Sequence, residues 1–235
     1  MAGAALGGLT DSSPGSGEVD RVRPGALGLL GGTFDPFNLG HLGLARAARD
    51  ELGLERVLVV PAAEPPHKPG RPISPALLRL AMVVAGIAGE PRLEASRIEI
   101  DRPGPSFTVD TVAELLATSP PGAPTDVIVI LSAESFAGLP SWHEADRLAA
   151  LARFAVAPRA GHPFPDLGEL AARLPGLADR VDRLDLPPIA VSASEIRRRA
   201  AVGASLGGLV PPAVATLIRD NGLYRQRQPQ ENDRP

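Results

Sequence analysis

Four short, largely apolar runs most constrain what this chain of 235 residues can fold into. They lie at residues 26–30, 56–61, 126–131 and 154–157, and stretches with apolar residues at helical spacing separate them. Strands that are apolar on both faces are typical of a parallel sheet that helices cover on both sides. The pattern therefore predicts an α/β fold with a Rossmann-like, doubly wound parallel sheet.

The remaining segments predict further elements and the domain limits. We expect helices at residues 39–52, 75–88, 108–117, 145–151, 194–201 and 212–220, the last two forming a small C-terminal helical part. Weaker patterns predict one or two strands within 92–100 and a strand at 180–186. We expect residues 1–26 to form a disordered N-terminal arm, residues 27–225 one domain, and residues 226–235 a flexible tail.

The composition excludes several kinds of site and partner. The chain has no cysteine, which excludes a disulfide scaffold, a thiolate zinc site, an iron–sulfur cluster and a cysteine nucleophile. It has 24 basic and 27 acidic residues and no long basic run, so we expect no nucleic-acid partner. The apolar runs are far shorter than the roughly 18 residues of a membrane span, and the N-terminus lacks the pattern of a secretory signal. We therefore expect a cytoplasmic protein without a membrane partner.

A glycine pair follows the first predicted strand, where a doubly wound sheet binds its ligands. Gly31 and Gly32 allow the main chain to approach a ligand closely, and the helix that begins a few residues later offers free amides to a phosphate. Asn38 and His41 are three residues apart at the start of that helix, so both can face the same ligand. The alternative is that Asn38 caps the helix and His41 only packs.

Two further segments predict phosphate contacts. Lys68 is the one lysine among 24 basic residues and lies in the stiff loop Pro65-Pro66-His67-Lys68-Pro69, where the alternative is a solvated surface side chain. Ser192 and Glu195 have the spacing of a capping box, which predicts a helix start. The amides there, with Ser194 and Arg197, would form a second anion site opposite the first, the alternative being a capped helix with solvated arginines.

Residues 31–41 read Gly-Gly-Thr-Phe-Asp-Pro-Phe-Asn-Leu-Gly-His, a segment similar to the Gly-Gly-Thr-Phe-Asp-Pro-x-His-x-Gly-His signature of bacterial nicotinate-nucleotide adenylyltransferases, a family of the nucleotidyltransferase superfamily. Asn38 replaces the first histidine of that signature. An asparagine can donate a hydrogen bond but cannot become cationic, a loss of about 1 kcal/mol of phosphate stabilisation. The resemblance implies a nucleotidyltransferase fold that binds ATP through Gly31, Gly32, Thr33, Phe34, Gly40, His41, Ser192, Ser194 and Arg197.

The other motifs extend the resemblance from about residue 27 to residue 225. The Pro-Pro-His-Lys loop, the segment Ser106-Phe107-Thr108 in place of Ser-Tyr-Thr, and the ending Leu223-Tyr224-Arg225 match the family in order. Ser132-Ala133-Glu134 departs from the family's Gly-x-Asp, because serine replaces glycine and glutamate is longer than aspartate. Trp142, the one tryptophan, stands where the family stacks a ring on the pyridine.

The resemblance also implies roles in the reaction. His41, Asn38, Lys68 and Arg197 would be catalytic. The mononucleotide would be held by Lys68, Phe107, Thr108, Glu134, Trp142 and Arg159. We expect transfer of AMP from ATP to nicotinate mononucleotide, giving nicotinate adenine dinucleotide and pyrophosphate, with Mg²⁺ brought by ATP and no fixed protein cage.

Two other functions stay open. One is a different adenylyl- or cytidylyltransferase of the superfamily, acting on a pantetheine phosphate or an alcohol phosphate; the segments at Thr108 and Trp142 argue against it. The other is a non-catalytic nucleotide-binding paralogue, which the departures at Asn38, Ser132 and Glu134 motivate.

Overall fold

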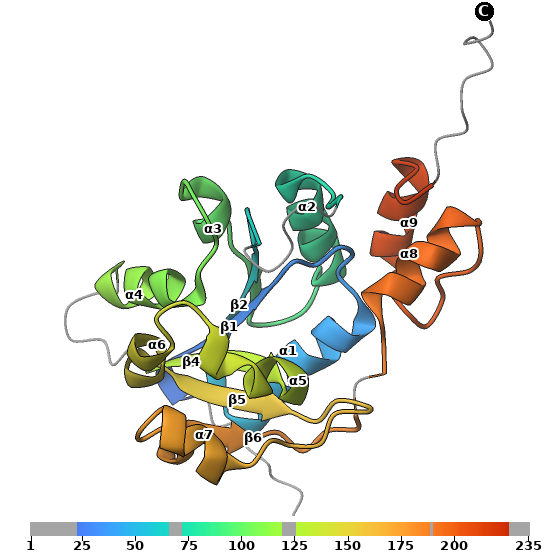
Figure 1. Cartoon of the computed structure of the whole chain (residues 1–235). Helices are drawn as coiled ribbons and strands as arrows, with labels where there is room; N and C mark the ends of the chain where they lie inside the picture. Colours follow the sequence, from blue (N-terminus) through green and yellow to red (C-terminus); the bar gives the residue numbers. More distant parts are fainter. Residues whose placement is uncertain (1–22, 66–71, 119–125, 189, 226–235) are drawn as a thin grey trace, which may run out of the picture.

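The computed structural model describes residues 23–65, 72–118, 126–188 and 190–225. These residues form a six-stranded, all-parallel sheet in the order β3-β2-β1-β4-β5-β6 (Figure 1). The strands are β1 (Arg23–Gly32), β2 (Leu54–Pro61), β3 (Leu93–Ala95), β4 (Asp126–Ser132), β5 (Arg153–Ala157) and β6 (Val181–Arg183). Because the chain winds outward from β1 to β3 and then returns to place β4 on the other side of β1, the predicted doubly wound sheet is confirmed.

Helices cover both faces of the sheet (Figure 1). They are α1 (Leu39–Glu51), α2 (Ala76–Gly86), α3 (Ile98–Asp101), α4 (Thr108–Thr118), α5 (Ala133–Ala137), α6 (Ala145–Leu151), α7 (Leu167–Arg173), α8 (Ala193–Ala201) and α9 (Pro212–Asp220). One face packs against α1, α2, α8 and α9, and the other against α4, α5, α6 and α7. Within the described ranges, no helix is long and apolar enough to span a membrane.

The continuous apolar runs are explained by this double cover. In β2, Val57 and Val59 face the layer that contains α1, whereas Leu58 and Val60 face the layer that contains α4. Because successive side chains of a strand point to opposite faces, the run from Val57 to Val60 is apolar at every position.

Two expectations require correction, and the sequence patterns also missed the helices α5 and α7. The N-terminal arm does not extend to residue 26, because β1 begins at Arg23, whose amide donates to the carbonyl of Gly53 at 2.6 Å. Main-chain pairing of this kind leaves no apolar pattern in the sequence. Region 92–100 holds the strand β3 and then the short helix α3 instead of a second strand. Helix α7 was not predicted, and among its described residues Leu170 alone is buried.

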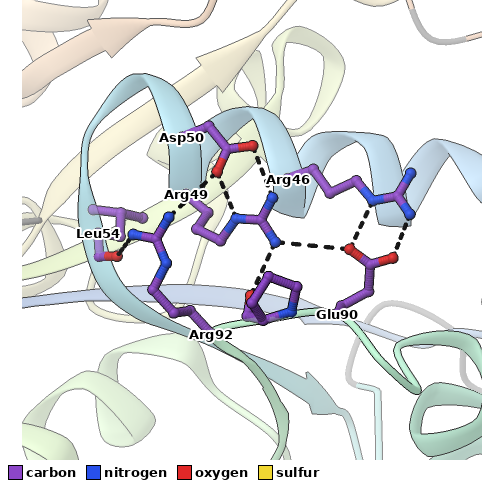
Figure 2. Close-up of polar contacts among 7 residues, drawn as sticks. Arg46, Arg49, Asp50, Leu54, Glu90 and Arg92 are labelled. Atoms are coloured by element: carbon purple, nitrogen blue, oxygen red, sulfur yellow. Dashed lines mark hydrogen bonds and ion pairs between the residues drawn. The ribbon is translucent and has the colours of Figure 1, made fainter. Parts of the chain in front are cut away.

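An ion-pair network fixes α1 to the segment that precedes β3 (Figure 2). Its charged members are Arg46, Arg49, Asp50, Glu90 and Arg92. Arg49 is 8% exposed, and it donates to Asp50 at 2.6 Å and to the carbonyl of Pro91 at 2.9 Å. The network lies where α1 ends and where β2 and β3 begin. It is therefore at the amino-terminal ends of the strands, away from their carboxyl ends.

Candidate active site

Two cavities open at the carboxyl ends of β1 and β4, where the strand order reverses. One has a volume of about 260 Å³ and the other of about 310 Å³. Both are lined by Gly31, Gly32, Leu131 and Ser135. Cavities that share a wall at this position form two compartments of one cleft, as a reaction between two substrates requires.

Gly31 forms the open corner between the two compartments. A Cβ atom placed on Gly31 meets no atom of the described chain within 4 Å. On Gly32, a Cβ would lie 2.9 Å from the ring of Phe34. The packing of the protein therefore explains the glycine at 32 but not the glycine at 31. The space in front of Gly31 belongs to the cleft, which agrees with the predicted close approach of a ligand.

The loop between β1 and α1 brings aromatic rings against His41. Phe34 has a φ of 49°, an unfavourable left-handed conformation for a bulky residue, and its side chain is 2% exposed. Its ring lies edge-on to that of His41, with 5.0 Å between centroids, and Phe37 lies 5.6 Å from the same ring. Phe34 thus packs against the ring of His41, and it also contributes to the wall of the larger cavity.

Asn38 and His41 form a reciprocal cap at the start of α1. The Asn38 Oδ1 atom accepts from the His41 amide at 3.1 Å, and the His41 Nδ1 atom accepts from the Asn38 amide at 3.2 Å. The cap that the alternative assigned to Asn38 is therefore confirmed, but its second part, in which His41 only packs, is not, because His41 also reaches the cavity wall. Because Nδ1 accepts, the proton of a neutral His41 ring is assigned to Nε2. Both residues and Gly40 also line the larger cavity.

Helix α8 reaches the same loop through Arg197. Its Nη1 donates to the carbonyl of Asp35 at 2.8 Å, and its Nη2 donates to the Ser194 hydroxyl at 3.2 Å. The structure thus brings the Ser192–Arg197 segment next to the Gly31–His41 segment, as predicted. Tyr224 joins them, since its hydroxyl donates to the Asp35 carboxylate at 2.7 Å. Burial, followed by this hydrogen bond, raises the pKa of Tyr224.

The predicted capping box at α8 is wrong, although the helix does begin there. Within the described chain, Ser192 occupies the N-cap position without a capping bond from its side chain. Glu195 pairs instead with Arg198 at 2.7 Å and Arg199 at 2.8 Å. Hydrogen bonds from Arg198 and then from Arg199 lower the pKa of Glu195 to about 2. Two neighbouring guanidinium groups outcompete a single amide for this carboxylate.

The smaller cavity gathers the residues predicted for the pyridine ring. Phe107, Thr108 and Trp142 line it, and Thr108 is the first residue of α4. Sequence reasoning gave no role to His143, whose ring stacks on Phe107 with 4.0 Å between centroids. Its position directly after Trp142 was the only signal that could have indicated it.

A buried carboxylate also lines the smaller cavity and was missed. Glu99 is 6% exposed and accepts from the Thr111 hydroxyl at 2.8 Å. Thr111 in turn accepts from Arg102 at 3.0 Å. Glu99 and Thr111 are distant in the sequence and meet only in the fold, so no local pattern indicates the pair. Ser135, which lines both cavities, was likewise missed.

The structure separates two predicted mononucleotide residues from the others. Glu134 pairs with Arg159 at 2.6 Å, and both line the larger cavity with Asn38 and His41. Phe107 and Trp142 line the smaller one. Lys68 lies outside the described residues.

Comparisons with known proteins agree with this geometry. A family model described as cytidylyltransferase-like matches residues 29–199. A "probable nicotinate-nucleotide adenylyltransferase" of Thermomicrobium roseum is 42% identical over 199 residues, covering 85% of this chain and 91% of that protein. One of Thermus thermophilus is 41% identical, covering 85% of this chain and 99% of that protein.

A solved structure shares the fold. Nicotinic acid mononucleotide adenylyltransferase of Plasmodium falciparum, complexed with NaAD, aligns with a TM-score of 0.69 at 15% identity. The alignment covers 85% of this chain and 97% of that one. Because the family model and the relatives near 40% identity cover most of the chain, this protein belongs to the cytidylyltransferase-like family and, within it, to the nicotinate-nucleotide adenylyltransferases.

Proposed function

We propose that the chain transfers the adenylyl group of ATP to nicotinate mononucleotide and releases pyrophosphate. The observation that carries this proposal is the identity of about 40% to relatives named for that activity, over 85% of the chain. The cleft with two compartments that meet at Gly31 and Gly32 supports it, since the two substrates need adjoining sites with their reacting phosphates close together.

The reaction requires the protein to align the two substrates, and no side chain has to react with either of them. A phosphate oxygen of the mononucleotide attacks the α-phosphorus of ATP, and the bond from that phosphorus to the oxygen bridging to the β-phosphate breaks. In the proposed arrangement the larger cavity holds ATP. His41, through Nε2–H, and the amide of Gly31 donate to the α-phosphate, while Ser194 and Arg197 hold the leaving pyrophosphate. Asn38 fixes the orientation of His41 through the reciprocal cap.

The smaller cavity would hold the mononucleotide. Trp142 would stack on the pyridine ring, and the amides at Phe107 and Thr108, where α4 begins, would receive the carboxylate. Charge-assisted hydrogen bonds to an anion are stronger than those to a neutral carboxamide, so this arrangement favours the acid over the amide.

Magnesium is proposed to enter with ATP. Among the described residues, no group of three or more His, Asp or Glu side chains could hold a metal ion together. Mg²⁺ commonly keeps waters and substrate phosphates as its ligands, which is the arrangement expected here.

A pyrophosphate-release assay tests the proposal. The purified chain is supplied with ATP, Mg²⁺ and, in separate reactions, nicotinate mononucleotide, nicotinamide mononucleotide, a pantetheine phosphate and an alcohol phosphate. We expect turnover with nicotinate mononucleotide and weaker turnover with its amide. Faster turnover with either of the last two would indicate another transferase of the superfamily. Nucleotide binding without turnover of any acceptor would indicate a non-catalytic paralogue.

A further inference from the structure

Arg79 on α2 is buried in an unusual way. It is 1% exposed, and its guanidinium donates to the main-chain carbonyls of Ser74 at 2.8 Å, Thr33 at 2.8 Å and Ala63 at 3.2 Å. Arg79 forms no direct ion pair with a carboxylate of the described chain, and the charge of Asp35 acts on it only from a longer distance. Burial lowers the pKa of Arg79, yet a guanidinium keeps its charge at neutral pH.

Packing alone does not explain an arginine at this position. Every other residue of α2 is uncharged, and burying a cation without a carboxylate is costly unless its donors are satisfied. A leucine or methionine would fill the space without that cost. Arg49 provides the contrast, because it is also buried but pairs directly with Asp50 (Figure 2). What distinguishes Arg79 is a planar fork that reaches three separate backbone segments at once.

Two of the three carbonyls, those of Thr33 and Ala63, belong to segments that line the cleft. Thr33 follows the glycine pair and, like Ala62 beside Ala63, lines the smaller cavity. Ala63 follows β2, and Ser74 precedes α2. Ala63 continues the chain of bonds, because its amide donates to the Ser106 hydroxyl at 2.9 Å.

Ser106 completes the connection to the mononucleotide side. Its own amide donates to the carbonyl of Glu64 at 3.1 Å, and Phe107 and Thr108 follow it directly. A continuous series of hydrogen bonds therefore runs from Thr33 through Arg79 and Ala63 to Ser106.

We infer that Arg79 is a positioning residue for the reaction: its guanidinium sets the spacing between the glycine loop on the ATP side and the Ser106–Thr108 segment on the mononucleotide side. The inference rests on the proposed function. A lysine cannot replace it, since one ammonium on a flexible stem cannot hold three carbonyls in a fixed plane. A displacement of about 1 Å between two bound substrates costs on the order of a hundredfold in rate.

The test compares Arg79→Lys with the matched variant Arg49→Lys. Urea unfolding and steady-state kinetics with ATP and nicotinate mononucleotide are measured for the parent and both variants. We expect both substitutions to lower the unfolding free energy. At saturating substrates, kcat of Arg79→Lys should fall about a hundredfold per folded molecule, with KM for ATP changed far less. Arg49→Lys should keep the parent kcat, because Arg49 lies at the amino-terminal ends of the strands, away from the cleft.

Two further variants cover the case in which Arg79→Lys fails to fold. Arg79→Gln avoids an unpaired buried charge and still holds fewer carbonyls, so its kcat should also fall. Ser106→Ala removes the next bond of the series and should lower kcat about tenfold without a large loss of stability. Folded Arg79 variants with the parent kcat, an unchanged Ser106→Ala enzyme, or an equal loss of kcat in Arg49→Lys would overturn the inference. A parent that turns over no mononucleotide would instead refute the proposed function.

Discussion

Replacing Gly31 by alanine should separate stability from activity. A Cβ at this position meets no described atom within 4 Å, and the residue is not in the left-handed region. The folded protein can therefore accept the methyl group without strain. Because alanine restricts the unfolded chain more than glycine does, the variant should be as stable as the parent or about 0.5–1 kcal/mol more stable.

Activity should change in the opposite direction. The new methyl group extends about 1.5 Å from the main chain into the corner that both cavities share. A phosphate held against the Gly31 backbone would be displaced by a similar distance, and kcat/KM should fall on the order of a hundredfold. An increase in Tm combined with a loss of activity is an outcome that general damage to the fold cannot produce.

Gly32→Ala is the matched control. Its Cβ would lie 2.9 Å from the buried ring of Phe34, so this variant should lose about 1–3 kcal/mol of stability from overpacking. Thermal unfolding and pyrophosphate-release kinetics are measured for both variants. The reasoning fails if Gly31→Ala keeps kcat/KM within about threefold of the parent, or if it is destabilised as much as Gly32→Ala.

Three other predictions concern single side chains. His41→Ala should lower kcat far more than it weakens ATP binding, because its contact strengthens as charge develops, and a kcat within about threefold of the parent would exclude a catalytic role. The parent should prefer nicotinate over nicotinamide mononucleotide by roughly tenfold to a hundredfold in kcat/KM, and Trp142→Ala should weaken both without changing that ratio, since stacking does not distinguish acid from amide. Burial and the bond to Asp35 raise the pKa of Tyr224, the one tyrosine of the chain, so native protein should show no tyrosinate absorbance at 295 nm near pH 10–11. The unfolding free energy of the protein should decrease as pH rises above about 10, because the tyrosine then ionises in the unfolded chain but not in the native one. A native tyrosine that titrates near pH 10 would contradict this prediction.

Local sequence patterns were enough to predict the class of fold and to locate the candidate site along the chain. Alternating apolar runs and helical stretches are local patterns, and each central strand carries its own burial requirement, so a doubly wound sheet could be predicted. The Gly31–His41 segment and the N-terminus of α8 could likewise be recognised from consecutive residues. These features depend on neighbours in the chain.

Which side chains meet depends on the packing of the folded chain. The capping box predicted at Ser192 and Glu195 did not form, because Arg198 and Arg199 bind Glu195 more strongly than an amide can. The Glu134–Arg159 pair came to lie with His41 instead of with Trp142, since the segments after β4 and β5 place it on the wall of the larger cavity.

Arg79 is the clearest case of what the sequence could not show. In the chain it is one arginine among many, with no motif around it. Its three carbonyl partners come from segments that only the fold brings together, and a main-chain oxygen leaves no trace in residue identity. Contacts between side chain and distant backbone are set by packing, so only the folded structure reveals them.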